Sequence, residues 1–206
     1  MPVGAYLSLL AHALRSVDDT STDARSLDER FPPGALLGRG AYKEVHAVLG
    51  NPNLALALCR KERPEGAGEG WSPAQHFARA RTALRRLRAA GVATVEVVAR
   101  GVASDGAPGV VYRRYAVGSK DPLERRLAFF NERSARDLAR LTAALATARI
   151  RVVDPQVLIG DDGTLVLADP QELLPNPRRL PQTFYGVSEL VEAYDDAQAS
   201  IYRSVC

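Results

Sequence analysis

The sequence has few of the residues that build disulfide or metal scaffolds. Among 206 residues there are two cysteines, Cys59 and Cys206, and three histidines, His12, His46 and His76. Two cysteines make neither a disulfide framework nor a zinc set, and a reducing compartment is expected. The histidines are scattered without ligand spacing, so we do not expect any of them to bind a catalytic metal.

Long apolar runs are also missing. No stretch approaches the roughly 18 to 20 apolar residues that a membrane span requires. The N-terminus has no basic stretch followed by a signal-like apolar region, so Sec-type export is not expected. The net charge of +3 is mild and identifies no class of partner. A hydrophobic content of 46% is enough for a packed core, which predicts one sizeable domain or a two-lobed unit.

The most informative stretch is 150–171. Its two apolar runs, 157–159 and 165–167, flank Gly160-Asp161-Asp162-Gly163, a strong signal for a tight hairpin turn. If the strands pair, Asp154, Gln156 and Asp169 meet at the open end of the hairpin. Two carboxylates and an amide form an oxygen-rich site of the type that holds Mg²⁺ against phosphate oxygens. The alternative is an ordinary hairpin with solvated acidic ends.

A second motif lies in 36–48. Two short apolar runs flank Gly38-Arg39-Gly40, and Ala41, Tyr42 and Lys43 follow, so a lysine stands where a G-x-G-x-x-G loop has its third glycine. Glycines let backbone N–H groups approach phosphate oxygens because no Cβ intervenes. Any glycine-rich β-turn gives the same letters, so this motif alone is weak support for phosphate binding.

The rest of the chain alternates between periodic and irregular segments. Apolar spacing and breakers predict strands over 54–59, 92–102 and 109–115, and helices over 2–17, 72–90, 122–131, 134–147 and 188–203. Ser72 and Ser134 are predicted helix caps. Residues 18–30 are predicted to be a loop, and four prolines predict no regular element over 170–182. Five arginines on the helix over 72–90 fit a solvated face better than a nucleic-acid site.

This order of motifs resembles the protein-kinase fold. The segment 38–45 is similar to the kinase glycine-rich loop, 54–60 takes the place of the third strand, and 112–118 that of the hinge, which implies nucleotide contact by Tyr115. The run 156–169 resembles the kinase segment from the metal-binding Asn to the Asp of DFG. The resemblance implies Asp169 and Gln156 as metal ligands and Asp154 as the catalytic-loop Asp that orients the substrate hydroxyl.

Several kinase features are absent from the sequence. The third strand ends Leu58-Cys59-Arg60 where a lysine is expected, and the helix over 72–90 has no glutamate. Asp154 lies only two positions before Gln156, and no A-P-E motif follows Asp169. Because one positive charge is needed near the transferred phosphate, Lys43 is the predicted phosphate lysine, with Arg60 and Lys61 as alternatives. A solvent-exposed strand lysine is the other reading of Lys43.

The G-x-G-x-x-K loop, the Asp154-Pro155-Gln156 catalytic loop and the Asp169-Pro170 end together resemble the HopBF family of bacterial type III effectors. That resemblance implies a minimal α+β bilobal protein-kinase-like fold, with a five-stranded antiparallel N-lobe over 1–117 and a reduced helical C-lobe over 118–206. It also implies an ATP- and Mg²⁺-dependent serine/threonine kinase secreted into the host cytoplasm. There it would phosphorylate the chaperone heat-shock protein 90, which it approaches as a client mimic.

Two other functions fit parts of the sequence. A pseudokinase-like protein-binding module would explain the missing third-strand lysine and the missing helix glutamate. A small-molecule phosphotransferase of the aminoglycoside or choline type would also tolerate variant loops, but such enzymes carry a larger helical lobe. Nucleotide-induced stabilisation, with and without Mg²⁺, distinguishes the kinase from the binding module.

Overall fold

The computed structural model of the protein describes residues 25–60, 72–170, 172–178, 182, 184 and 187–205. The predicted helix over 2–17 and the predicted alternative Lys61 lie outside these residues. Among the described helices, none has the length and apolar character needed to cross a bilayer.

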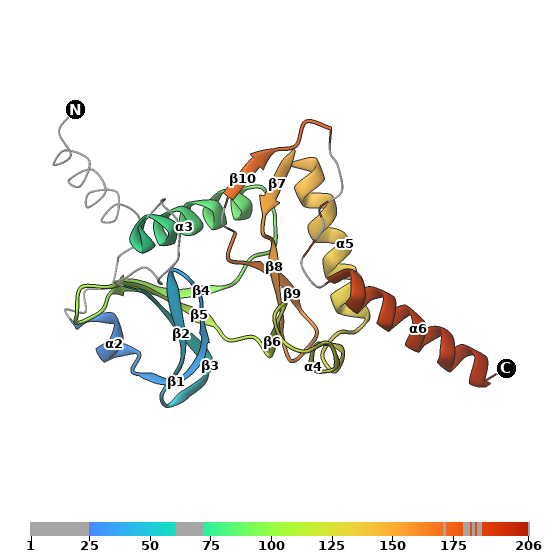
Figure 1. Cartoon of the computed structure of the whole chain (residues 1–206), viewed down its shortest axis with the longest axis horizontal. Helices are drawn as coiled ribbons and strands as arrows, with labels where there is room; N and C mark the ends of the chain where they lie inside the picture. The colour runs from blue at the N-terminus through green and yellow to red at the C-terminus, as the bar shows by residue number, and fades with distance from the viewer. Residues whose placement is uncertain are drawn as a thin grey trace.

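A five-stranded antiparallel sheet forms the first lobe (Figure 1). Its spatial order is β1-β2-β3-β5-β4. The strands are β1 (Pro33–Arg39), β2 (Lys43–Val48), β3 (Asn51–Cys59), β4 (Val97–Val102) and β5 (Pro108–Arg113). This is the predicted sheet with one helix inserted after the third strand, α3 (Pro73–Ala89). A short helix, α2 (Leu27–Arg30), lies in the segment predicted to be a loop, so that prediction is wrong there.

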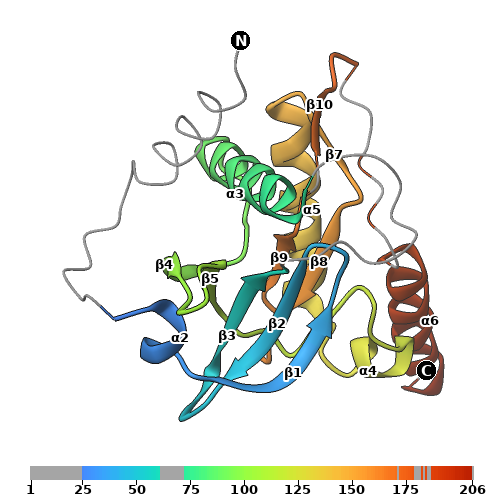
Figure 2. The ribbon, with the colours of Figure 1, turned by 60° about the vertical axis from the view of Figure 1, so that its left-hand side comes forward.

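Helices cover both faces of this sheet because side chains alternate along each strand. On one face, Leu56 and Val111 pack with Leu27 of α2. On the other face, Ala57 and Val110 pack with Phe77 of α3. Figure 2 shows α3 running between the sheet and the strands β7 (Ile150–Val153) and β10 (Glu172–Pro175) of the second lobe. The helix α3 therefore contacts both lobes, through β3 of the sheet and β10 of the second lobe.

Local signals set the ends of α3. The Ser72 side chain accepts a hydrogen bond from Gln75 N, Gln75 returns one to Ser72 N, and Pro73 takes the first helical position. The helix ends at Ala90, and Gly91 follows with a φ of 77°, a left-handed conformation that glycine adopts without strain. The prediction of a helix from Ser72 to Ala90 is confirmed.

The second lobe combines two small sheets with three helices. A three-stranded sheet has the order β6-β8-β9, and a two-stranded sheet pairs β10 with β7. The remaining elements are β6 (Val117–Gly118), α4 (Leu123–Leu127), α5 (Glu132–Thr147), β8 (Gln156–Ile159), β9 (Leu165–Ala168) and α6 (Val187–Val205). The hairpin β8–β9 and α5 supply much of one core, including Leu141, Leu145 and Leu167, all with exposures of 1% or less.

The strand β10 corrects the prediction that prolines keep 170–182 irregular. Residues Glu172–Pro175 pair antiparallel with β7, from Glu172 opposite Val153 to Pro175 opposite Ile150. Proline lacks only the N–H donor and is tolerated at a sheet edge. Pro175 is the last residue of β10, and β10 pairs with a single strand among the described residues. The rule against proline therefore applies to strand interiors and not to this position.

The cap of α5 also differs from the prediction. Asn131, not Ser134, is the N-cap, and its side-chain oxygen accepts hydrogen bonds from the N–H groups of Arg133 and Ser134. Ser134 closes the capping box by accepting from Asn131 N at 3.2 Å. Its hydroxyl also donates to Gly163 O at 2.7 Å. The start of α5 is thereby attached to the turn of the β8–β9 hairpin.

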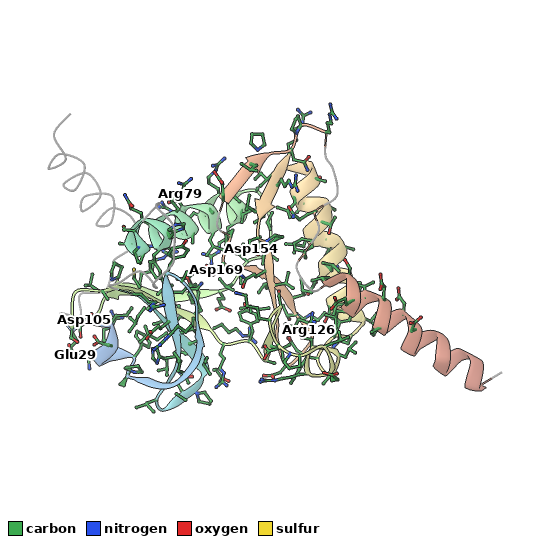
Figure 3. The ribbon with its side chains drawn as sticks, in the orientation of Figure 1. Glu29, Arg79, Asp105, Arg126, Asp154 and Asp169 are labelled. Carbon is green, nitrogen blue, oxygen red and sulfur yellow. The ribbon has the colours of Figure 1, made fainter. Side chains whose placement is uncertain are left out.

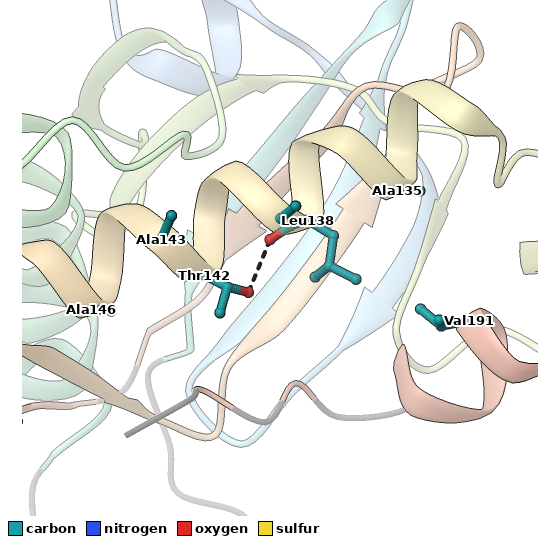
Figure 4. A pocket seen from close by; sticks show the side chains of 7 residues that line it. Ala135, Leu138, Thr142, Ala143, Ala146 and Val191 are labelled. Atoms are coloured by element: carbon teal, nitrogen blue, oxygen red, sulfur yellow. Dashed lines mark hydrogen bonds between the residues drawn. The ribbon is translucent and has the colours of Figure 1, made fainter. Parts of the chain in front are cut away.

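An apolar groove lies between α5 and α6 (Figure 4). Its volume is about 560 Å³, and it is lined by small residues of α5 together with Leu138, Thr142 and Val191. Thr142 donates its hydroxyl hydrogen to Leu138 O at 2.9 Å. No titratable side chain lines the groove. It therefore has none of the groups needed for phosphoryl transfer, and the chemistry must be sought elsewhere.

Candidate active site

The open end of the β8–β9 hairpin brings the predicted polar residues together. Gln156 stands opposite Ala168 in the antiparallel register, so Asp169 emerges beside the start of β8. Gln156 Nε2 donates to Asp154 Oδ2 at 3.2 Å. In the view of Figure 3, the labels of Asp154 and Asp169 both fall between α3 and β8. The hairpin therefore gathers two carboxylates and an amide at one place.

Both aspartates at this end have a left-handed backbone. The φ angle is 49° at Asp154 and 48° at Asp169. This conformation costs an L-residue about 1 kcal/mol or more, although aspartate tolerates it better than most. A buried proline follows each of them, Pro155 and Pro170. Strained backbone of this kind clusters at functional sites, where it directs side chains.

Lys43 of the first lobe forms an ion pair with Asp169 of the second. Lys43 Nζ lies 2.7 Å from Asp169 Oδ1, and the two side chains are 23% and 33% exposed. Burial acts to lower the pKa of Lys43, but the Asp169 carboxylate, together with Tyr112, outweighs it and raises the pKa above the usual 10.5. Lys43 is therefore a cation at neutral pH. Lys43 is the first residue of β2 and stands opposite Cys59, at the end of β3 where the kinase lysine is missing.

The turn between β1 and β2 is short and tightly bonded. Gly40 N donates to Lys43 O at 2.9 Å, Arg60 N donates to Tyr42 O at 3.0 Å, and an Arg60 side-chain N–H donates to Gly40 O at 3.3 Å. Arg39 extends outward and pairs with Glu44 at 2.9 Å, and Ala41 is exposed.

Nothing in the packing requires glycine in this turn. A Cβ added at Gly38 would meet no atom within 4 Å, and one at Gly40 would meet only Lys43 O at 3.7 Å. Neither glycine has a positive φ. The space beside both backbones is therefore open to a ligand.

The same turn is attached to α3 by an aromatic contact. The rings of Tyr42 and His76 stack with centroids 3.6 Å apart and planes inclined by 11°. In kinases a lysine–glutamate pair joins the third strand to the helix, but α3 has no acidic residue in its sequence. Here the ring stack connects the β1–β2 turn, the candidate phosphate-binding loop, to α3. His76 was not predicted as a site residue. The only sequence signal for it was an aromatic ring in the first turn of the helix that begins at Pro73.

Two tyrosines, Tyr112 and Tyr115, stand at the end of β5 and just after it. Tyr115, the predicted hinge contact, packs against the buried cluster that contains Val95 and Ala168, and its hydroxyl accepts from Glu96 N at 3.3 Å. Burial raises the pKa of Tyr115. Tyr112 was not predicted as a site residue. Its pKa is also raised, first by burial, and both Lys43 and Asp169 act on its hydroxyl.

The donors at the open end suit a hard metal ion. No three His, Cys, Asp or Glu side chains gather as a metal cage within the part of the chain that the structure describes. Asp169 and Gln156 offer oxygen donors, since Gln156 directs Nε2 to Asp154 and keeps Oε1 available. Mg²⁺ is commonly held by one or two protein oxygens and completed by phosphates and water. The residues present therefore fit Mg²⁺ that arrives with a polyphosphate.

Residues 9–193 match the family model described as the type III secretion system effector HopBF1 kinase domain. The chain belongs to this family. The fold is thus a minimal bilobal kinase fold of the α+β class, and the activity of the family is that of a kinase, a phosphotransferase. The expected family, five-stranded lobe and reduced helical lobe are confirmed. Secretion by a type III system follows from the family as well.

Solved structures of other kinases show a more distant likeness. The CAK complex of Chaetomium thermophilum bound to ATP-gamma-S matches with 23% identity and a TM-score of 0.48, over 69% of this chain and 47% of that one. A crystal structure of WbdD matches with 15% identity and a TM-score of 0.45, over 71% and 34%. This chain thus spans less than half of the length of either. No curated protein matches the sequence.

Proposed function

We propose that this kinase is a single bilobal domain hinged near 117–119 that transfers the γ-phosphate of ATP to serine or threonine in a protein. The observation that carries the proposal is the ion pair between Lys43 and Asp169, with Nζ and Oδ1 2.7 Å apart. It joins a cation from the glycine-rich turn to a carboxylate at the hairpin end. Between them these groups supply the charges that a metal-bound triphosphate needs.

Each residue has one task in this mechanism. Mg²⁺, when bound, would neutralise charge on the β- and γ-phosphates, held by Asp169 and Gln156. Lys43 would exchange part of its contact with Asp169 for phosphate oxygens, and its raised pKa keeps it charged for this. The backbone N–H groups of 38–42 would cover the phosphates, since the two glycines leave that space open.

Asp154 is the group assigned to the substrate hydroxyl. It is exposed and accepts a hydrogen bond from Gln156, which links its orientation to that of the metal ligand. A carboxylate fixed at this place would orient the hydroxyl toward the γ-phosphate. Most of the rate enhancement would then come from positioning and electrostatics.

The substrate proposal rests on the family resemblance. We propose the host chaperone heat-shock protein 90 as substrate, in the host cytoplasm. Mass spectrometry of the chaperone after incubation with the protein and Mg-ATP tests this. We expect a new phosphoserine with the wild type and none with Asp169→Asn. Phosphate on other host proteins but not on the chaperone would contradict the substrate and leave the kinase proposal standing.

The structure also sharpens the binding-module alternative. The missing third-strand lysine motivates this alternative, and the ion pair that Lys43 of β2 forms with Asp169 supports the kinase over it. A module without activity should show no stabilisation by ATP. Thermal unfolding with saturating ATP and Mg²⁺ distinguishes the two, because a kinase should unfold several degrees higher with nucleotide.

A further inference from the structure

The helix α3 carries arginines on its inner face. Phe77, Arg81, Leu84 and Arg88 follow each other at spacings of four, three and four, so they form one stripe along the helix. Phe77 and Leu84 in that stripe are buried against the sheet and the second lobe. Arg81 and Arg88 are partly buried. Their guanidinium groups thus lie at the inner side of the helix and not on its solvated face.

A third arginine meets this stripe from the sheet. Arg100 of β4 stands opposite Val110 in the register, on the face where Val110 packs with Phe77. Its Nε is buried and has no hydrogen-bond partner within the described residues. A buried N–H without an acceptor destabilises the fold, and more so when the group is charged.

The three guanidinium groups have no anionic partner in the described part of the chain. Arg88 donates to Thr94 Oγ1 at 2.7 Å and to Val95 O, and both acceptors are neutral. The pKa values of Arg81 and Arg88 are lowered, first by burial and then by the charge of Arg100. Adjacent, partly buried cations without counter-charge are unfavourable, which indicates that an anion completes this place.

We propose that Arg81, Arg88 and Arg100 form a site between α3 and β4 that binds a phosphate group, separate from the nucleotide site. A phosphate dianion presents more acceptor oxygens than a carboxylate and matches the fork geometry of guanidinium groups. It can therefore bind three arginines, for which a single carboxylate has too few oxygens. Exposed Arg85, one turn after Arg81, stands at the rim, where a ligand would enter.

Tyr112 connects this site to the catalytic cleft. The charges of Arg81 and Arg100, as well as those of Lys43 and Asp169, act on the pKa of its hydroxyl. A phosphate bound between α3 and β4 would neutralise the arginines and fix α3 against the sheet. Because α3 also holds the glycine-rich turn through His76, the bound anion would steady that turn.

Thermal unfolding with inorganic phosphate, against chloride at equal ionic strength and without nucleotide, tests the site. We expect a rise of about 4 °C at saturating phosphate in the wild type and in Lys43→Met, which removes the phosphate ligand of the cleft. Arg100→Met keeps the aliphatic stem and should lose the rise. Arg140→Met, at a side chain 78% exposed on α5, is the matched control and should keep it.

Arg100→Met without phosphate gives a second readout. Because the lost charge has no partner, the variant should unfold at or above the wild-type temperature, whereas loss of a structural contact would lower it. Arg81→Met replaces Arg100→Met in both measurements if Arg100→Met does not fold.

A phosphoserine peptide and its unphosphorylated form identify the source of the phosphate. Stabilisation by the phosphopeptide assigns a phosphorylated chain, and stabilisation by inorganic phosphate alone assigns a small molecule. No rise in the wild type, or an equal rise in Arg100→Met, would overturn the site.

Discussion

Each end of the β8–β9 hairpin carries an ion-paired aspartate, but the two aspartates differ in backbone conformation and in the origin of their partners. At the turn end, Asp162 accepts from Thr164 N at 3.0 Å and pairs with Arg133 at 2.7 Å, both close in space and on the same lobe. At the open end, Asp169 has a left-handed backbone and its partner Lys43 comes from the other lobe. Acidic residues are structural at one end and positioned across a lobe boundary at the other.

Glycine shows the same contrast between structural and free positions. Gly163 at the hairpin turn has a φ of 80°, and an added Cβ would overlap the side chain of Asn131. Gly38 in the β1–β2 turn meets nothing within 4 Å and has no positive φ. Gly163 is therefore needed for the fold, whereas Gly38 leaves space beside the backbone for a ligand. The space around each glycine thus separates a structural position from a candidate binding position.

The largest effect should separate Asp169 from Asp162. Asp169→Asn should lower the phosphoryl-transfer rate by about 10³-fold or more, because it removes the proposed metal ligand and the partner of Lys43. Asp162→Asn should leave the rate within about twofold and lower the free energy of unfolding by about 0.5–1 kcal/mol. Steady-state rates and urea unfolding of both variants measure this. Equal loss of rate in the two would break the comparison.

Lys43 should matter more than the nearby Arg60. Lys43→Met should cost about 10²-fold in rate, since it removes the cation proposed to contact the transferred phosphate. Arg60→Met should cost no more than about tenfold, because the Arg60 side chain contributes a single hydrogen bond, to Gly40 O, in this turn. Rates at saturating ATP for each variant decide between them. The opposite ranking would assign the phosphate contact to Arg60.

The glycines should differ in stability. Gly163→Ala should lower the free energy of unfolding by about 2 kcal/mol, through left-handed strain and overlap with Asn131. Gly38→Ala should change it by less than about 0.5 kcal/mol and instead weaken nucleotide binding. Chemical unfolding combined with nucleotide titration measures both. A Gly38→Ala variant that binds ATP as the wild type does would show that this turn does not approach the phosphates.

The stack between Tyr42 and His76 should have a smaller effect. His76→Ala should raise the KM for ATP about threefold with kcat nearly unchanged, since a ring pair contributes about 0.5–1.5 kcal/mol. His76→Phe keeps a ring at this place and should restore most of the affinity. An unchanged KM in His76→Ala would mean that the turn does not depend on α3 for its position.

The two ends should also respond to opposite extremes of pH. Hydrogen bonds from Thr164, then Arg133, lower the pKa of Asp162 below 3.8, so its contribution to stability is present above that pH and is lost as pH falls below it. Asp169 raises the pKa of Lys43 above 10.5, so that contribution is full below pH 10.5 and is lost as pH rises through the folded value. Unfolding of Asp162→Asn and Lys43→Met against the wild type across pH measures both windows.

Sequence patterns predicted the features that depend on neighbouring residues. The hairpin followed from Asp162-Gly163 between two apolar runs, and α3 from Ser72-Pro73. The meeting of Asp154, Gln156 and Asp169 followed from strand pairing alone, because a two-stranded register fixes which residues share an end. Their catalytic roles stay predictions.

Other features could not be read from the sequence because they depend on contacts between distant segments. The β7–β10 pair joins Ile150 to Pro175, and local proline counts say nothing about which edge a strand occupies. Asn131 and not Ser134 is the cap because the helix begins at Glu132, and Ser134 in its first turn instead donates its hydroxyl to Gly163 O, 29 residues away. The approach of Arg100 to α3 likewise requires the order β3-β5-β4.

Binding of ATP with and without Mg²⁺, measured by calorimetry on the wild type, Asp169→Asn and Asp162→Asn, tests the central claim most directly. We predict that Mg²⁺ tightens ATP binding by about tenfold or more in the wild type and in Asp162→Asn, and not in Asp169→Asn. Metal-dependent binding that persists in Asp169→Asn, or no ATP binding by the wild type, would contradict the assignment of the open hairpin end as the nucleotide–metal site.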